Sequence, residues 1–163
     1  MRKHSKQIAL GGVMAALAVT IMSLGGLIPV ATYVCPVLCC LLLHTVLQSC
    51  GSRIAWAWYG AVAILSLLLG PDKEAAAVFV FLGYYPIIKP NMDKLPACRL
   101  WKALYFNAVI LSMYWLLIHL FGMAEIAREY VELGMVFTIV TLIMGNMIFF
   151  MLDRILDRFH FRT

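Results

Sequence analysis

The chain has 163 residues, of which 64% are hydrophobic and only 13% are charged. A soluble domain is about half apolar and about a quarter charged. This composition therefore excludes a disordered chain and most soluble enzymes, and it predicts an all-α integral membrane protein. The net charge of +5 does not indicate nucleic-acid binding, because the basic residues lie in short loops where membrane topology accounts for them.

Six apolar segments are candidates for membrane-spanning helices, each of which needs about 20 mostly apolar residues. In chain order they are Ile8–Ile28, Ala31–Ser49, Ile54–Gly70, Lys73–Ile88, Leu104–Gly122 and Leu133–Leu152. The basic N-terminus is typical of a signal peptide, but no clear cleavage site follows the first segment, so we expect it to remain as a helix. Without an internal repeat or a long linker, residues 1–163 are predicted to form a single transmembrane domain.

The first segment carries small residues at helical spacing. Gly11 and Ala15 are four residues apart, as are Gly12 and Ala16. Small residues on one face let another helix approach closely. The partner is either a neighbouring helix of this chain or a helix of another protein.

The loop after the first segment is uncharged, contains Tyr33 and is bounded by Pro29 and Pro36. Cys35 and Cys39 follow one helical turn apart, a spacing that suits a soft metal ion. No histidine completes such a site, and cysteine also packs well as a small apolar side chain. We therefore expect no metal here. The five cysteines, an odd number, do not indicate a disulfide framework.

Asp72, Lys73 and Glu74 interrupt two apolar runs. One interpretation is structural: Asp72 caps the following helix, and Glu74 lies favourably at the positive end of the helix dipole. The other places the three charges at the mouth of a pocket for a polar ligand, and the two interpretations are compatible. The uncharged part of this fourth segment is short and ends near Pro86, so it is either a crossing or a re-entrant hairpin.

The charge distribution favours a crossing. With six crossings, eleven of the thirteen Lys and Arg residues lie on one side of the membrane, and five of the eight acidic residues lie on the other. If the fourth segment did not cross, the basic loop from Lys89 to Lys102 would change sides and the asymmetry would largely vanish. The positive-inside rule therefore predicts a multi-pass protein of the cell membrane with both termini in the cytoplasm.

Polar residues recur in the last two segments. Ser112, Trp115 and His119 share one side of the fifth segment, where they either contact a solute or anchor the helix at the headgroups. The sixth segment carries a stripe of small residues that favours helix packing: Gly134, Thr138, Thr141 and Gly145. Asn107 and Asn146 are each expected to bond to another helix.

No catalytic constellation is recognisable. The chain lacks a Ser/His/Asp or Cys/His set and the zincin, Walker and Rossmann motifs. We therefore expect a protein that is not an enzyme and that holds no cofactor or metal.

The chain resembles the substrate-binding S component of an energy-coupling factor (ECF) transporter. The resemblance rests on six helices with both ends inside, a basic N-terminus before an Ala/Gly-rich first helix, and the proline-bounded loop. It implies a membrane subunit that captures a small water-soluble nutrient, such as a vitamin or its precursor, at the outer face. Delivery inward would require a transmembrane coupling subunit and two ATPase subunits.

The resemblance also implies roles for particular residues. The docking surface for the coupling subunit would comprise Gly11, Gly12, Ala15 and Ala16. Substrate-binding candidates, by position, are Tyr33, Asp72, Lys73, Glu74, Trp115 and His119. The alternative is a small membrane scaffold or assembly protein of the rod-shape-determining type, which has a similar helical layout and transports no solute.

Overall fold

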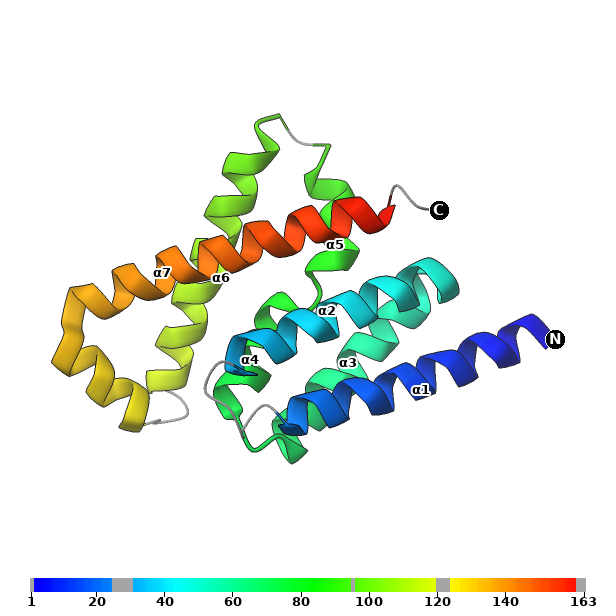
Figure 1. Ribbon diagram of the computed structural model, residues 1–163, viewed down its shortest axis with the longest axis horizontal. Helices are drawn as coiled ribbons and strands as arrows, with labels where there is room; N and C mark the ends of the chain where they lie inside the picture. The colour runs from blue at the N-terminus through cyan, green and yellow to red at the C-terminus, as the bar shows by residue number, and fades with distance from the viewer. Residues whose placement is uncertain (1, 25–30, 95, 120–123, 161–163) are drawn as a thin grey trace. The chain divides into compact units, whose positions relative to one another are not determined.

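The computed structural model describes residues 2–24, 31–94, 96–119 and 124–160; within these ranges the side chains of 2–4, 31, 118, 119, 124–133, 137, 159 and 160 are excepted. All regular secondary structure in this part of the chain is helical, which confirms the all-α class (Figure 1). The helices are α1 (Arg2–Leu24), α2 (Ala31–Cys50), α3 (Ser52–Leu69), α4 (Lys73–Leu82), α5 (Tyr85–Met92), α6 (Cys98–His119) and α7 (Ala124–His160). Ile28 and Gly122, the predicted ends of the first and fifth segments, lie outside the described residues.

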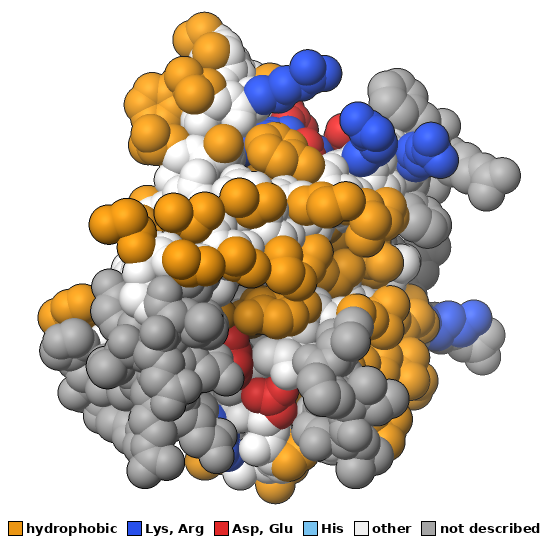
Figure 2. Space-filling model, turned by 60° about the vertical axis from the view of Figure 1, so that its left-hand side comes forward, with side chains coloured by type: hydrophobic (Ala, Val, Ile, Leu, Met, Phe, Trp, Pro, Cys, Tyr) orange, Lys and Arg blue, Asp and Glu red, His pale blue; other side chains and the backbone are white. Residues whose placement is uncertain are grey.

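Five stretches of the described chain are long and apolar enough to cross a membrane. They are Ser5–Leu24, Thr32–Cys50, Ser52–Leu69, Cys98–Leu117 and Gly134–Arg158. Hydrophobic side chains cover much of the face drawn in Figure 2. Such exposure suits lipid as the surrounding solvent, because a soluble protein rarely exposes a large continuous apolar patch. The length and composition of these helices therefore indicate a membrane protein.

The helices group into two units, one ending at Asp93 and the other beginning at Lys94. In the first unit α1 packs against α2 and α3, and α2 also packs against α4 and α5. Its core joins Met22, Leu43, Trp58 and Phe79 with several small side chains, and Cys35 and Cys39 are buried among them as apolar residues. The prediction of a single transmembrane domain stays a prediction.

The fourth predicted segment is divided into α4 and α5 by a turn at Gly83 and Tyr84. Pro86 accounts for the break, because it has no N–H to donate to the carbonyl of Leu82 four residues earlier. Neither helix alone has spanning length. The twenty residues from Lys73 to Met92 would together extend about 30 Å as continuous helix, the thickness of the hydrocarbon core.

Side-chain contacts show that the chain from Lys73 to Tyr84 runs back along most of α3. Two residues that follow the turn at Asp72 contact α3: the Val80 carbonyl accepts a hydrogen bond from the Tyr59 hydroxyl, and Tyr84 stacks on the Trp56 ring with centroids 6.2 Å apart. Trp56 lies in the second turn of α3. By Tyr84 the chain has thus returned nearly to the level at which α3 began. This register favours a crossing over a shallow hairpin, although the sixth crossing itself stays a prediction.

In the second unit α6 and α7 pack as an antiparallel pair, because Lys102 meets Asp153 and Asn107 meets Asn146. The Phe106 and Phe149 rings stack with centroids 4.8 Å apart, and Gly145 lies against Phe106, where a β-carbon on the glycine would be 2.9 Å from the ring. α7 contains a kink at Gly134, whose φ of 52° and ψ of −128° are accessible to glycine and strained for other residues. The predicted fifth and sixth segments left residues 123–132 between them as a loop, and this is wrong from Ala124 on, because α7 begins there, before the kink.

Candidate functional site

Four of the six predicted solute-binding residues lie together at one end of the first unit: Tyr33, Asp72, Lys73 and Glu74. Together with Thr32 they form a group that we call the Asp72 cluster. Asp72 precedes α4, and its Oδ1 accepts a hydrogen bond of 3.0 Å from the Ala75 N–H. The other oxygen, Oδ2, accepts one of 2.7 Å from the Thr32 hydroxyl at the start of α2. The predicted N-cap is thus confirmed, and the same carboxylate also joins two helices.

The other members of the Asp72 cluster are also engaged within the unit. The Tyr33 hydroxyl donates to Glu74 Oε1 at 3.2 Å. Lys73 Nζ donates to the carbonyls of Leu67 and Gly70, at 2.8 and 2.9 Å, so the ammonium lies at the carbonyl end of α3. The favourable interaction of a cation with that end of a helix is expected from the dipole. A ligand in this cluster would have to replace or extend these bonds.

The remaining two candidates belong to the second unit. Trp115 lies on α6 with 62% of its surface exposed, and the side chain of His119 lies outside the described residues. The hydroxyl of Ser112 donates to the carbonyl of Val109 in its own helix, at 2.8 Å. Trp115 and the Asp72 cluster belong to different units, and a shared solute site remains a prediction.

The predicted docking residues of α1 lie on two different faces. Gly11 is buried, with Ile54 of α3 beside the position of a β-carbon, and half-buried Ala15 packs against the core. Gly12 and Ala16 are exposed, and no atom lies within 4 Å of a β-carbon placed on Gly12. One pair thus serves packing within the chain, and only the other pair is accessible to a partner.

The exposed pair belongs to a longer stripe of small side chains along α1, which we call the small-residue face: Ser5, Ala9, Gly12, Ala16, Thr20 and Ser23, all exposed. Their spacings of three or four residues keep them on one side of the helix. Thr20 and Ser23 donate to the carbonyls of Ala16 and Val19, both at 2.9 Å. Their hydroxyls are satisfied within α1, so the face is smooth and compatible with lipid or with another helix.

The second unit contains polar pairs between its helices. Asn146 Nδ2 donates to Asn107 Oδ1 at 2.7 Å, which confirms the expected inter-helix bonds of both residues. Lys102 is only 3% exposed, and its Nζ lies 3.0 Å from both oxygens of Asp153. Sequence reasoning missed this ion pair by treating Lys102 as a loop cation. Its signal was available: opposite charges at the start of one helix and the end of the next meet when the helices are antiparallel.

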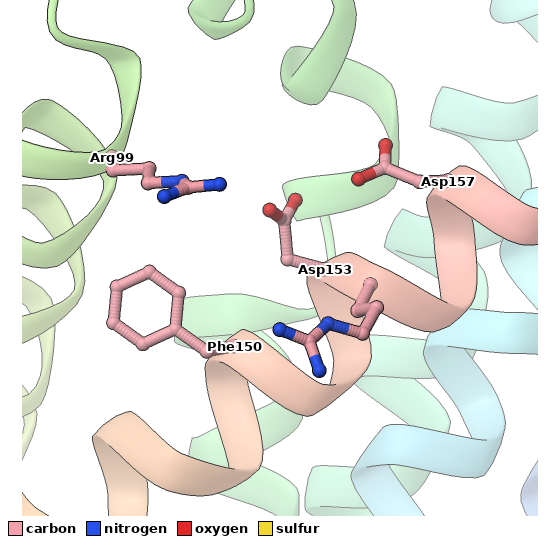
Figure 3. Close-up of a pocket in the computed structure, with 5 residues that line it drawn as sticks. Arg99, Phe150, Asp153 and Asp157 are labelled. Atoms are coloured by element: carbon pink, nitrogen blue, oxygen red, sulfur yellow. The ribbon is translucent and has the colours of Figure 1, made fainter.

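Sequence reasoning also missed a cavity of about 310 Å³ at this end of the second unit. It is lined by Arg99 of α6 and by Phe150, Asp153, Arg154 and Asp157 of α7. Figure 3 shows the Arg99 guanidinium directed across this space toward the carboxylates of Asp153 and Asp157. The cavity combines two cations, two anions and one aromatic ring, so it suits a small polar or amphiphilic ligand better than an apolar one.

Among the described residues, no group of three His, Cys, Asp or Glu side chains is placed to hold a metal ion. The polar clusters described above are held by hydrogen bonds and ion pairs between protein atoms. The chain matches no protein-family model, no curated protein and no solved structure.

Proposed function

We propose that this protein is the substrate-binding membrane subunit of an importer of the ECF type. It would capture a small water-soluble nutrient, such as a vitamin or its precursor, and deliver it inward together with a coupling subunit and two ATPases. The chain has no Walker motif of its own, so transport driven by ATP would require a partner that hydrolyses it.

The small-residue face of α1 is the observation that carries this proposal. α1 already packs on α2 and α3 through its other side, which includes Gly11, Ala18 and Met22. Gly12 and Ala16 are therefore not needed for packing within the first unit. A smooth stripe over nearly the whole length of a spanning helix is the type of surface on which membrane helices associate.

The Asp72 cluster is the proposed place of the solute. It offers a phenol, two carboxylates and an ammonium at one end of the helices, which would be the outer end in the predicted topology. The N-terminus of α4 adds a favourable field for a negatively charged group. Trp115 and His119 remain candidates from the second unit.

Tagged protein purified from its own host tests the proposal. We expect it to retain a coupling subunit, two ATPases and a small solute, detected by native mass spectrometry. Ala16→Trp should release the three protein partners and keep the solute, because a bulky ring would separate the helices. Leu17→Trp is the matched control: Leu17 is the next residue on α1, exposed on a different side, and the change should keep all partners. Wild-type protein without ATPases or solute would refute the transport function.

A membrane scaffold is the second candidate, and the bonds within the Asp72 cluster favour it. Thr32 binds Asp72 and Tyr33 binds Glu74 directly, so part of the polar surface is used to hold α2 and α4 together. In a scaffold the small-residue face would bind another membrane protein without ATPase subunits. Copurified proteins from the same experiment distinguish the two candidates.

A further inference from the structure

The cavity of the second unit has an unbalanced set of charges. Asp153 is already compensated by Lys102, whose Nζ lies 3.0 Å from both carboxylate oxygens. Arg99 and Arg154 then face one further carboxylate, that of Asp157. Among the described side chains, neither arginine has an ion pair within 4 Å. The charged side chains that line the cavity are two arginines and two aspartates, and Lys102 beside Asp153 adds a third cation. Among the described side chains, this group therefore has one more cation than anions, which is complementary to a monoanion.

The candidate spanning stretches put the cavity near the depth expected for lipid headgroups. Arg99 is the second residue of the spanning stretch Cys98–Leu117, and the α7 residues lie within the last nine positions of the stretch Gly134–Arg158. Both stretches therefore place the cavity at one membrane-water boundary. Long basic side chains at such a boundary commonly contact phosphate groups, and basic pockets between spanning helices bind lipid headgroups.

An exposed apolar stripe of α7 leads directly into the cavity. Ile143, Met147 and Phe150 follow one another at spacings of four and three residues, and they are 64%, 77% and 38% exposed. Arg154 and Asp157 continue the same stripe at spacings of four and three, so all five side chains lie on one side of the helix. The stripe is thus apolar along its length and charged at its end, as a phospholipid is.

We propose that this cavity binds the headgroup of a phospholipid. The phosphodiester lies between the guanidinium groups of Arg99 and Arg154, which suit phosphate oxygens because each presents several N–H donors in one plane. One acyl chain follows Phe150, Met147 and Ile143 along α7. The ligand is a lipid and not a soluble phosphate, since a soluble ligand would gain nothing from the apolar stripe. The site is independent of the proposed transport function.

Asp157 makes the site selective among phospholipids. Its carboxylate oxygens are hydrogen-bond acceptors. Headgroups that carry hydroxyl or ammonium donors are therefore favoured over the trimethylated choline headgroup, which has none. The excess positive charge further favours phosphatidylglycerol, a monoanion with hydroxyl groups, over neutral phosphatidylethanolamine.

Competition in nanodiscs tests the site. The full chain is reconstituted in phosphatidylcholine containing a small fraction of fluorescent phosphatidylglycerol, and energy transfer from the protein's tryptophans reports retention. We expect unlabelled phosphatidylglycerol to displace the probe best, phosphatidylethanolamine less well and phosphatidylcholine poorly. Arg99→Gln with Arg154→Gln should weaken binding about tenfold or more. Asp157→Asn should keep phosphate binding but reduce the preference over phosphatidylcholine.

Arg53→Gln is the matched control, since Arg53 is an exposed arginine at the start of α3 outside the cavity. It should bind the probe as the wild type does. An equal loss in Arg53→Gln would overturn the proposal in favour of general surface charge, and displacement by millimolar glycerol 3-phosphate would overturn it in favour of a soluble phosphate ligand. Thermal unfolding of every variant separates lost binding from lost folding. If the double variant unfolds, Arg99→Lys with Arg154→Lys replaces it. This variant should bind the probe more weakly than the wild type, because an ammonium lacks the planar donor set of a guanidinium.

Discussion

At the scale of single residues, Asp72 combines a structural role and a proposed binding role in one carboxylate. One oxygen caps α4 and the other accepts the hydroxyl of Thr32 from α2. The two sequence interpretations of Asp72, a cap and part of a ligand site, were compatible in principle. The structure confirms the cap, so a variant that keeps the cap and removes the charge is needed to test binding.

Two substitutions of Asp72 separate these roles. Asp72→Ala should lower the free energy of unfolding by about 1–2 kcal/mol, because the Ala75 N–H and the Thr32 hydroxyl both lose their acceptor. Asp72→Asn should be nearly as stable as the wild type, since asparagine is an equally good cap and its Nδ2 would donate to the Thr32 hydroxyl oxygen in place of the bond that Oδ2 accepts. Thermal unfolding in detergent measures both. If Asp72→Asn also retains the copurified solute, the charge of Asp72 has no part in binding; equal melting of Asp72→Ala and the wild type would contradict the cap.

At the scale of helices, close contact between α6 and α7 depends on Gly145. The Phe106 ring, only 3% exposed and stacked on Phe149, occupies the space that a β-carbon on Gly145 would enter. The stripe of small residues in the sixth segment predicted helix packing, and the contact of Gly145 with α6 is such packing. Which helix it would meet was not visible, because a stripe defines a face and leaves the partner open.

Gly145→Ala should destabilise the protein by about 1 kcal/mol, because the steric overlap with Phe106 costs more free energy than the better helix propensity of alanine contributes. Gly60→Ala in α3 is the control, because no atom lies within 4 Å of its β-carbon position, and it should stabilise by about 0.5–1 kcal/mol. Unfolding in detergent gives both values. Phe106→Leu should restore part of the loss in Gly145→Ala by vacating the space. If Gly145→Ala and Gly60→Ala changed the free energy of unfolding equally, Phe106 would move aside without cost and the predicted overlap would be wrong.

The helix α1 illustrates how far a sequence pattern reaches at this scale. Spacing predicted a small-residue surface from Gly11, Gly12, Ala15 and Ala16 together. Two small-residue steps one position apart are turned by about 100° around the helix, so one step can be buried while the other is exposed. The sequence contains both steps with equal weight. Only the position of α3, with Ile54 beside Gly11, decides which step remains available.

At the scale of the whole molecule, hydropathy and charge predicted most of the helices and little of the chemistry. The apolar runs located α1, α2, α3 and α6 to within about six residues at each described end, because a spanning helix must satisfy its own backbone. Pro86 indicated a break without giving the course of the chain after it. The cavity and the Lys102–Asp153 pair were not predicted, since each requires two helices to be aligned residue by residue.

The number of crossings decides on which side each loop lies, and epitope tags test it. With six crossings, tags at the N-terminus, between Asp93 and Ala97, and at the C-terminus should all be protected from a protease added outside intact cells. With five crossings, the tag after Asp93 and the C-terminal tag would both be cleaved. We expect protection of all three, because eleven basic residues then lie on the cytoplasmic side. A tag placed between Gly70 and Asp72 is the control for an outer loop and should be cleaved.

During synthesis, α3 emerges before α4 and is long enough to enter the bilayer alone, whereas α4 has ten residues and a lysine at its first position. Such a segment partitions poorly into lipid by itself. The bonds from Lys73 to the end of α3 and from Tyr59 to Val80 hold the two helices as a hairpin. We therefore expect α3 and α4 to leave the insertion machinery together, with α3 making the membrane insertion of the shorter, charged α4 favourable.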